Sequence, residues 1–135
     1  MRPEDRHEAL RARIRERLET VVDPCSVAAG AGAGLVSMGL VGDIALCDRA
    51  DGTHVAVTLF ITSPTCIMAA IFEEAAAREI RALPGVARVT VRTDRTHLWH
   101  SDEMTPEYRQ QLSEYRAAQA RAHAARQSAA AAQPV

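Results

Sequence analysis

The stretch "VAVTLFITSPTCIMAAIFEEAAAREI", residues 55–80, decides the fold because its apolar period changes half-way along. Its first part is apolar at every second position, which is typical of a strand with one buried face. These positions are Val55, Val57, Leu59 and Ile61. After Pro64, apolar residues recur every four positions, which is typical of a helix with a broad buried stripe. The expected stripe contains Met68, Phe72, Ala76 and Ile80, flanked by Ile67 and Ile71. The stretch therefore predicts a strand that leads directly into the central packing helix.

The segments on either side of this stretch supply two more strands. Residues 41–47 alternate in the same way, and Asp51-Gly52 provides a tight turn, so an antiparallel hairpin is predicted. The motif "LPG", residues 83–85, ends the helix, and "VARVTVRT" follows with a third alternating pattern. A right-handed crossover is expected to join the second strand to the third.

Two outer helices complete the pattern. Leu10, Ile14 and Leu18 form one apolar stripe over residues 5–20, and Asp23-Pro24 ends that helix. A last helix begins at Thr105-Pro106-Glu107, where a capping hydroxyl, a proline and an acid stand in the favoured order. The order α-β-β-α-β-α predicts an α+β domain with a mixed three-stranded sheet and helices packed on one face.

Residues 1–116 are expected to form the domain, and two segments are expected to add little to its core. We interpret the Gly/Ala segment 28–34 as a flexible loop, because it contains no side chain able to pack. The Ala-rich tail, residues 117–135, has no large apolar residue before Val135 and is expected to be helical or frayed.

The composition excludes several classes of function. The chain has 135 residues, 47% of them hydrophobic, which is enough for one modest core. Its formal net charge of -1 provides no basic field for nucleic acid. No apolar stretch approaches the roughly 18 residues of a membrane span, and the first residues are charged. We therefore expect a cytoplasmic protein that binds neither nucleic acid nor membrane.

The three cysteines are the main candidates for chemistry. Cys25, Cys47 and Cys66 are an odd number in a chain without an export signal, which favours free thiols or metal ligands over disulfides. Cys66 is expected in the first helical turn, where unpaired backbone N–H groups favour the thiolate. The helix terminus stabilises a thiolate by only about 0.3–1 kcal/mol. Because one pKa unit corresponds to about 1.36 kcal/mol, this lowers the thiol pKa by less than one unit. Ionisation therefore needs a metal or a positive neighbour; the alternative is that Cys66 simply fills the strand–helix junction.

Several short motifs occur in an order that resembles the SufT/PaaD-like family of metal-sulfur cluster assembly proteins, from about Leu18 to Leu112. They are Asp23-Pro24, "MGLVGDI" (38–44), "TSPTC" (62–66), "LPGVARVTVRT" (83–93) and "WHSDEMTPEYRQQL" (99–112). The resemblance implies a small α/β fold. It also implies a role in maturing or delivering iron–sulfur clusters, or in supporting an oxygenase that depends on a metal or cluster. Asp23, Thr62 and Cys66 match the positions that line the family's pocket.

The chain departs from this family at three points. Cys25 replaces the acid that follows Asp-Pro, a Gly/Ala insert lengthens the next loop, and Ile67 replaces a proline. A thiol at position 25 would be a better ligand for soft iron or zinc than a carboxylate. The alternative is that Cys25 lies in a loop and has no role.

The number of thiols limits what one chain can hold. An iron–sulfur cluster usually takes four thiolates, and this chain has three cysteines, of which Cys47 is expected on a strand face with Asp43 and Ala45. We therefore expect a non-enzymatic assembly or delivery factor with Cys66, and Cys25 as second candidate, as a transient ligand of iron or a cluster; zinc is the other metal considered. The missing ligands would come from a second subunit of a homodimer or from a client iron–sulfur or oxygenase protein.

Other functions remain as alternatives. The chain could be a metal-free adaptor or accessory protein for a multicomponent oxygenase, or a thiol enzyme with Cys66 as nucleophile, although no sequence feature pairs that thiol with a base. His97 and His100 could supply imidazoles to the same metal, but solvated histidines beside a packed Trp99 are the simpler interpretation. A KH-type RNA-binding module is excluded because its GXXG clamp is missing between two helices.

Overall fold

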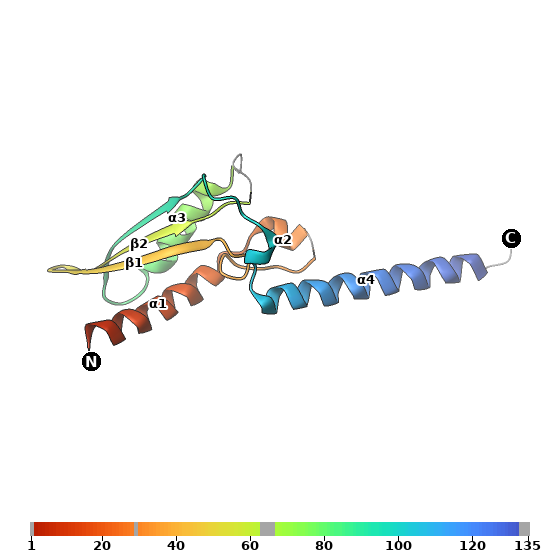
Figure 1. Cartoon of the computed structure of the whole chain (residues 1–135), viewed down its shortest axis with the longest axis horizontal. Helices are drawn as coiled ribbons and strands as arrows, with labels where there is room; N and C mark the ends of the chain where they lie inside the picture. Colours follow the sequence, from red (N-terminus) through yellow and green to blue (C-terminus); the bar gives the residue numbers. More distant parts are fainter. Residues whose placement is uncertain (1, 29, 63–66, 133–135) are drawn as a thin grey trace.

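The computed structural model describes residues 2–28, 30–62 and 67–132. Its main elements follow the predicted order of helix, two strands, helix, strand and helix (Figure 1). They are α1 (Pro3–Glu19), α2 (Pro24–Ala28), β1 (Val41–Arg49), β2 (Gly52–Leu59), α3 (Ala69–Arg81), β3 (Val86–Thr93) and α4 (Pro106–Ala132). The sequence pattern does not predict the short helix α2 or the 3-10 turn η1 (Ser101–Glu103).

The three strands form one mixed sheet with β2 in the centre. β1 and β2 are antiparallel, and a two-residue turn joins them because Arg49 pairs with Gly52. Gly52 has a φ of +132°, a conformation that glycine adopts without steric cost. β2 and β3 are parallel, and α3 supplies the long connection that parallel strands require. The predicted hairpin and mixed sheet are both confirmed.

The hydrophobic core lies on one face of this sheet. Val55, Val57 and Leu59 of β2 are buried, whereas Ala56 is exposed on the opposite face. The helical members of the same cluster include Leu10, Ile14 and Leu18 of α1 and Phe72, Ala76 and Ile80 of α3. Burying a large aliphatic or aromatic side chain contributes about 1.5–3 kcal/mol. These helices therefore cover one face of the sheet, while the residues on its other face remain open to solvent.

The buried stripe of α3 is narrower than the sequence predicted. Ile67 is 89% exposed and Ile71 is 57% exposed, so the expectation that both flank a buried stripe is wrong. Ile71 lies nine residues before the buried Ile80, which places it about half a turn away around a helix of roughly 3.6 residues per turn. The small residues Ala69 and Ala77 are buried instead.

The Gly/Ala segment also packs more closely than expected. Ala31 and Ala33 are buried and belong to the core cluster, so the statement that no side chain there can pack is wrong. A Cβ added to Gly34 would lie 1.9 Å from the carbonyl oxygen of Glu19. Small residues are therefore used here because two stretches of backbone approach one another closely.

Helix α4 is anchored only at its beginning. Tyr108 and Leu112 are buried, whereas the side chains from Arg116 to Ala131 are exposed. Figure 1 shows the rest of the helix extending away from the sheet. Of the two alternatives for the tail, the structure therefore has the helix, which continues to Ala132. Within the described part of the chain, no helix has the length and apolar character needed to cross a bilayer.

Candidate functional site

Asp23 lies between α1 and α2 and is only 4% exposed. Its backbone N–H donates to the carbonyl of Ala33 (2.9 Å), and its own carbonyl accepts from the Ser26 hydroxyl (2.6 Å). The Ser26 oxygen in turn accepts the N–H of Ala33 (2.8 Å). These bonds attach α2 to the Gly/Ala segment. They fix the backbone of Asp23 through both its N–H and its carbonyl group.

Tyr108 reaches the same region from the first turn of α4. Its hydroxyl donates to the carbonyl of Ala31 (2.6 Å), and the side chain is buried. Burial, and after it the nearby Asp23 carboxylate, raise the pKa of Tyr108. Asp23, Ser26 and Tyr108 thus form one buried polar group, which we call the aspartate cluster. Ser26 and Tyr108 donate to the backbone carbonyls of Asp23 and Ala31, so they satisfy backbone groups of the buried segment that contains the Asp23 carboxylate.

Sequence reasoning found Asp23 but missed its two partners. The sequence pattern gives Ser26 and Tyr108 no role. A buried tyrosine needs a partner for its hydroxyl, so this residue could have indicated a polar contact. Its partner Ala31 is 77 residues away in sequence, and no local pattern identifies it.

Several segments gather where β2 ends, and the aspartate cluster lies among them. Backbone hydrogen bonds connect Leu35 to Val21, Phe60 to Leu40, Asp94 to Leu59 and Thr105 to Ser37. Thr62 follows β2 at this end of the sheet and is exposed. The structure therefore places the predicted residues Asp23 and Thr62 at the same end of the molecule.

The predicted cysteine ligands lie beyond what the structure describes. Cys66 lies within the undescribed residues 63–66, so its expected place in the first helical turn stays a prediction; α3 itself begins at Ala69. Cys25 lies in α2, but its side chain is also outside the described atoms. Cys47 is a free, exposed thiol on β1. The proximity of Cys25 and Cys66 consequently stays a prediction.

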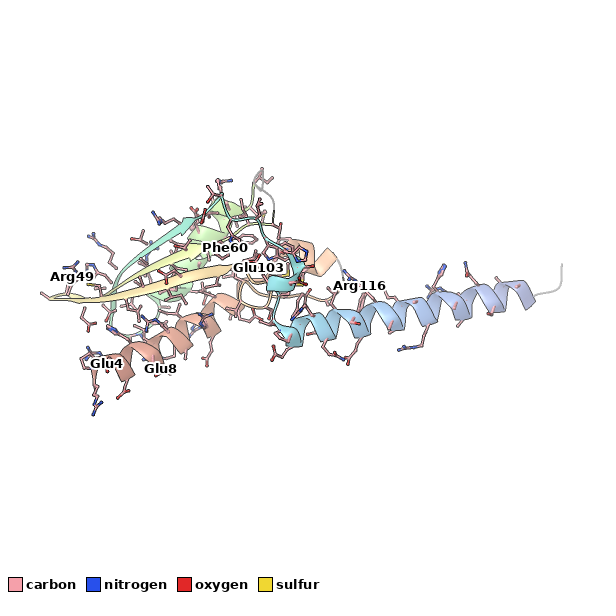
Figure 2. The ribbon with its side chains drawn as sticks, viewed as in Figure 1. Glu4, Glu8, Arg49, Phe60, Glu103 and Arg116 are labelled. Carbon is pink, nitrogen blue, oxygen red and sulfur yellow. The ribbon has the colours of Figure 1, made fainter. Side chains whose placement is uncertain are left out.

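A second cluster surrounds the turn η1 at this end of the sheet. The His97 ring stacks on Phe60, with ring centroids 3.7 Å apart, and its Nε2 lies 2.5 Å from Glu103 Oε1. Figure 2 labels Phe60 and Glu103 near the centre of the molecule. Glu103 also accepts the backbone N–H of His100 (2.8 Å). Burial opposes the ionisation of Glu103, but the His100 N–H and the His97 ring outweigh it and lower the pKa of Glu103.

This second cluster fixes the loop before α4. Trp99 donates its indole N–H to the carbonyl of Met38 (2.8 Å), and the His100 ring accepts the N–H of Asp102 (3.1 Å). The His97 ring therefore contacts Glu103, whereas the His100 ring contacts Asp102. Among the described residues, there is no group of three or more His, Cys, Asp or Glu side chains that could hold a metal ion. These contacts favour a structural role for both histidines.

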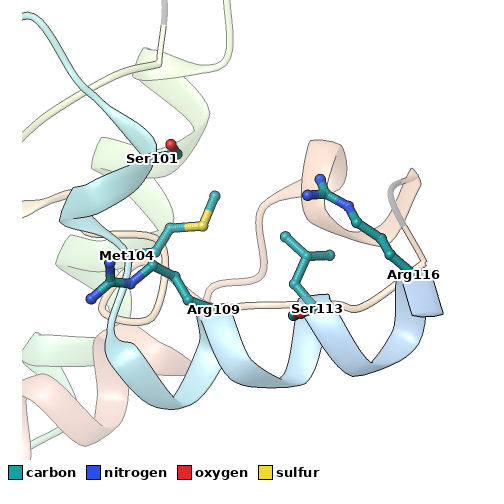
Figure 3. Close-up of a pocket in the computed structure, with 6 residues that line it drawn as sticks. Ser101, Met104, Arg109, Ser113 and Arg116 are labelled. Carbon is teal, nitrogen blue, oxygen red and sulfur yellow. The ribbon is translucent and has the colours of Figure 1, made fainter. Parts of the chain in front are cut away.

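A groove of about 300 Å³ lies between η1 and α4 (Figure 3). Ser101, Met104, Arg109, Leu112, Ser113 and Arg116 line it. Met104 and Arg116 point into it from two sides in Figure 3, and Arg109 lies 4.0 Å from Asp102. The groove combines the apolar side chains of Met104 and Leu112 with two guanidinium groups, a composition that suits an acidic protein segment. Sequence reasoning missed it, although Arg109 and Arg116 are two helical turns apart and so share one face.

Comparisons with known proteins agree with this architecture. The sequence profile of a family described as "Iron-sulfur cluster assembly protein" matches residues 11–91. No curated protein sequence matches the chain. The crystal structure of a domain of unknown function, DUF59, from Bacillus anthracis is 23% identical to this chain. The similarity covers 78% of this chain and 93% of the other, with a TM-score of 0.64, and supports the fold.

A second solved structure is that of Rv1466 from Mycobacterium tuberculosis, a protein associated with Fe-S complex assembly and repair. It is 25% identical, and the match covers 79% of this chain and 86% of the other with a TM-score of 0.46. Asp23, Thr62 and Cys66 fall inside the range of the family profile. Tyr108 and the groove on α4 lie outside it.

Proposed function

Because the chain belongs to the iron-sulfur cluster assembly protein family, we propose that it assembles or delivers clusters for client metalloproteins, with Cys66 as a transient ligand. The observation that carries this proposal is the aspartate cluster. It holds a buried carboxylate at the end of the sheet from which the chain continues through Thr62 to Cys66. In this role the protein is a carrier and not an enzyme, and the cluster is its cargo.

The geometry of the sheet restricts which thiols can act together. Cys47 pairs with His54 near the hairpin turn, whereas Thr62 follows the opposite end of β2. His54 and Leu59 are five residues apart, or about 16 Å along a strand. Cys47 is therefore not expected to share a cluster with Cys66 within a single chain. At most Cys25 and Cys66 remain, and four thiolates are usual, so a second subunit or a client must supply the others.

Such incomplete ligation favours transfer. A cluster held by two thiolates leaves iron positions for an incoming client thiolate, whereas a fully ligated cluster does not. The groove beside Arg109 and Arg116 lies near this end of the sheet and is proposed to hold an acidic segment of the client. Two exposed guanidinium groups speed such an encounter at low salt more than they strengthen the final complex.

Anaerobic reconstitution with ferrous iron and sulfide tests the carrier proposal. Wild type is expected to develop the absorption of a cluster and to transfer it to an apo-ferredoxin. Cys66→Ser is expected to lose most of this absorption, whereas Cys47→Ser retains it as the matched control. Equal uptake by wild type and Cys66→Ser would reject Cys66 as a ligand. Cys25→Ser shows whether a second thiol of the chain contributes.

The alternative proposal is a metal-free adaptor that supports a multicomponent oxygenase. It is favoured by the groove itself, because apolar side chains beside two arginines can bind a protein without any metal. Iron, zinc and sulfide analysis after oxygen-free purification separates the two functions. Iron with stoichiometric sulfide supports the carrier. Protein free of both that still stimulates an oxygenase supports the adaptor.

A further inference from the structure

The outer face of the sheet, opposite the core, carries a small hollow of about 170 Å³. Its lining includes Ala45 and Cys47 of β1, His54 and Ala56 of β2, and Arg88 and Thr90 of β3. Apart from His54, which is partly exposed, these residues are exposed, so no helix of the described chain covers them. The carrier function proposed above does not use this face.

Two metal-binding side chains stand next to each other in the hollow. Cys47 and His54 are direct partners in the antiparallel pairing of β1 and β2. Side chains of such partners project from the same face with Cβ atoms about 4.5–5.5 Å apart. A thiolate and an imidazole are both ligands for zinc and similar divalent metals. The register therefore places two suitable donors side by side.

The His54 ring is held by a carboxylate at one of its two nitrogens. Its Nε2 lies 2.8 Å from Asp51 Oδ1. A histidine bound to a metal almost always donates its other ring N–H to a carboxylate or carbonyl. With Nε2–H donated to Asp51, the lone pair is on Nδ1. The pair of Asp51 and His54 thus resembles a ligand with its supporting carboxylate already in place.

One chain supplies only half of a metal site here. Zinc in structural sites takes four ligands in a tetrahedron, and the described residues contain no group of three or more candidate ligands. A second copy related by a twofold axis would present the same surface and the same two donors. The small side chains of Ala45 and Ala56 next to the hollow permit such a close approach. Two thiolates would also balance the charge of a divalent ion beside Arg88.

We propose that Cys47 and His54 form half of a site for a divalent metal of zinc type, completed by the same two residues of a second copy. Asp51 is the positioning residue that orients His54. The site is separate from Cys66, since it lies near the hairpin turn at the other end of β2. Pairing through this face therefore leaves the end with Asp23 and Thr62 accessible.

Cobalt(II) titration of a full-length Cys25→Ser/Cys66→Ser variant tests the proposal, because Cys47 is then the last thiol. The expected result is a thiolate-to-cobalt charge-transfer band together with the intense visible bands of a tetrahedral site. Both should saturate at one cobalt per two chains, and zinc should displace them. Sedimentation equilibrium should detect the dimer with metal and the monomer after chelation.

Single substitutions assign the ligands. Cys47→Ser and His54→Asn should abolish the cobalt spectrum and the metal-dependent dimer, and Asp51→Asn should weaken metal affinity by about 10–100-fold. Asp43→Asn, on the same face, and His123→Asn, on α4, are matched controls and should bind cobalt like the parent variant. An unchanged spectrum in His54→Asn, a site with one cobalt in a monomer, or no thiolate band in the folded parent variant would each overturn the proposal.

Two further comparisons keep the test decisive. Should the double variant fail to fold, the same titration of wild type against Cys47→Ser measures the contribution of Cys47 directly. Cys66→Ser alone should keep cobalt-dependent dimerisation even where it loses cluster uptake. Failure of the carrier function and failure of this metal site therefore give different results.

Discussion

Replacing Tyr108 by phenylalanine should destabilise the domain by about 1–3 kcal/mol, the cost of leaving a buried polar group without its partner. The change keeps the aromatic ring and removes only the hydroxyl, which donates to the carbonyl of Ala31 (2.6 Å). That carbonyl belongs to the packed Gly/Ala segment, so the substitution should also loosen the attachment of α4 to this segment. A positive result would show that the aspartate cluster stabilises the fold.

The expected change in melting temperature follows from the size of the chain. An unfolding entropy of about 2.1 cal/mol/K per residue gives roughly 3.5 °C per kcal/mol for a protein of this length. Tyr108→Phe should therefore melt about 4–10 °C below wild type. Urea titration followed by circular dichroism should give a lower midpoint at an unchanged slope.

Tyr115→Phe is the matched control on the same helix. Its hydroxyl accepts a hydrogen bond from the exposed Gln119 (2.8 Å), so its loss should change stability by less than about 0.5 kcal/mol. If Tyr108→Phe also stays within that limit, or if the two variants lose equal stability, the aspartate cluster does not hold α4 to the domain.

Three further predictions concern other parts of the molecule. Gly39 has a φ of +73°, and an added Cβ would lie 2.1 Å from a carbonyl oxygen, whereas Gly85 has a φ of +85° with nothing near its Cβ. Thermal melts should therefore show that Gly85→Ala loses only about 1–2 kcal/mol of stability, the cost of backbone strain. Gly39→Ala should lose clearly more, because its Cβ also clashes. Asp48 has its pKa lowered from 3.8 to about 2, first by its hydrogen bond with His7. A depressed carboxyl pKa stabilises the fold above the unfolded value, so the stability difference between wild type and Asp48→Asn should shrink as pH falls from 4 to 2; a difference constant with pH would contradict this. Removing residues 120–135 should leave the urea midpoint unchanged within error, because the described side chains there are exposed; a large decrease would mean that the tail packs.

The order of elements could be predicted because each depends on a local period. The alternation through Val55, Val57 and Leu59 reports a strand with one buried face, and the structure buries all three. The spacing of Leu10, Ile14 and Leu18 likewise reports the stripe of α1 that is buried. Asp23 and Thr62 came from the resemblance to a family, and no period indicates either residue.

What could not be predicted depends on contacts between distant segments. Ala31 and Ala33 looked unable to pack, but small side chains are buried wherever two backbones come close, and only the tertiary structure determines that. Ile71 is apolar yet exposed, since the face that α3 buries is fixed by Phe72 and Ile80. Hydrophobicity alone cannot choose between two faces of a helix that both carry apolar residues.

The free part of α4 changes how the molecule moves through solution. From Arg116 to Ala132 the helix continues for 17 residues, or about 25 Å at a rise of roughly 1.5 Å per residue, with its described side chains exposed. Such a projecting rod increases friction without adding much mass, so the monomer should elute early from a sizing column and tumble slowly in anisotropy measurements. Oligomeric state should accordingly be read from mass, by sedimentation equilibrium or light scattering, and not from elution volume.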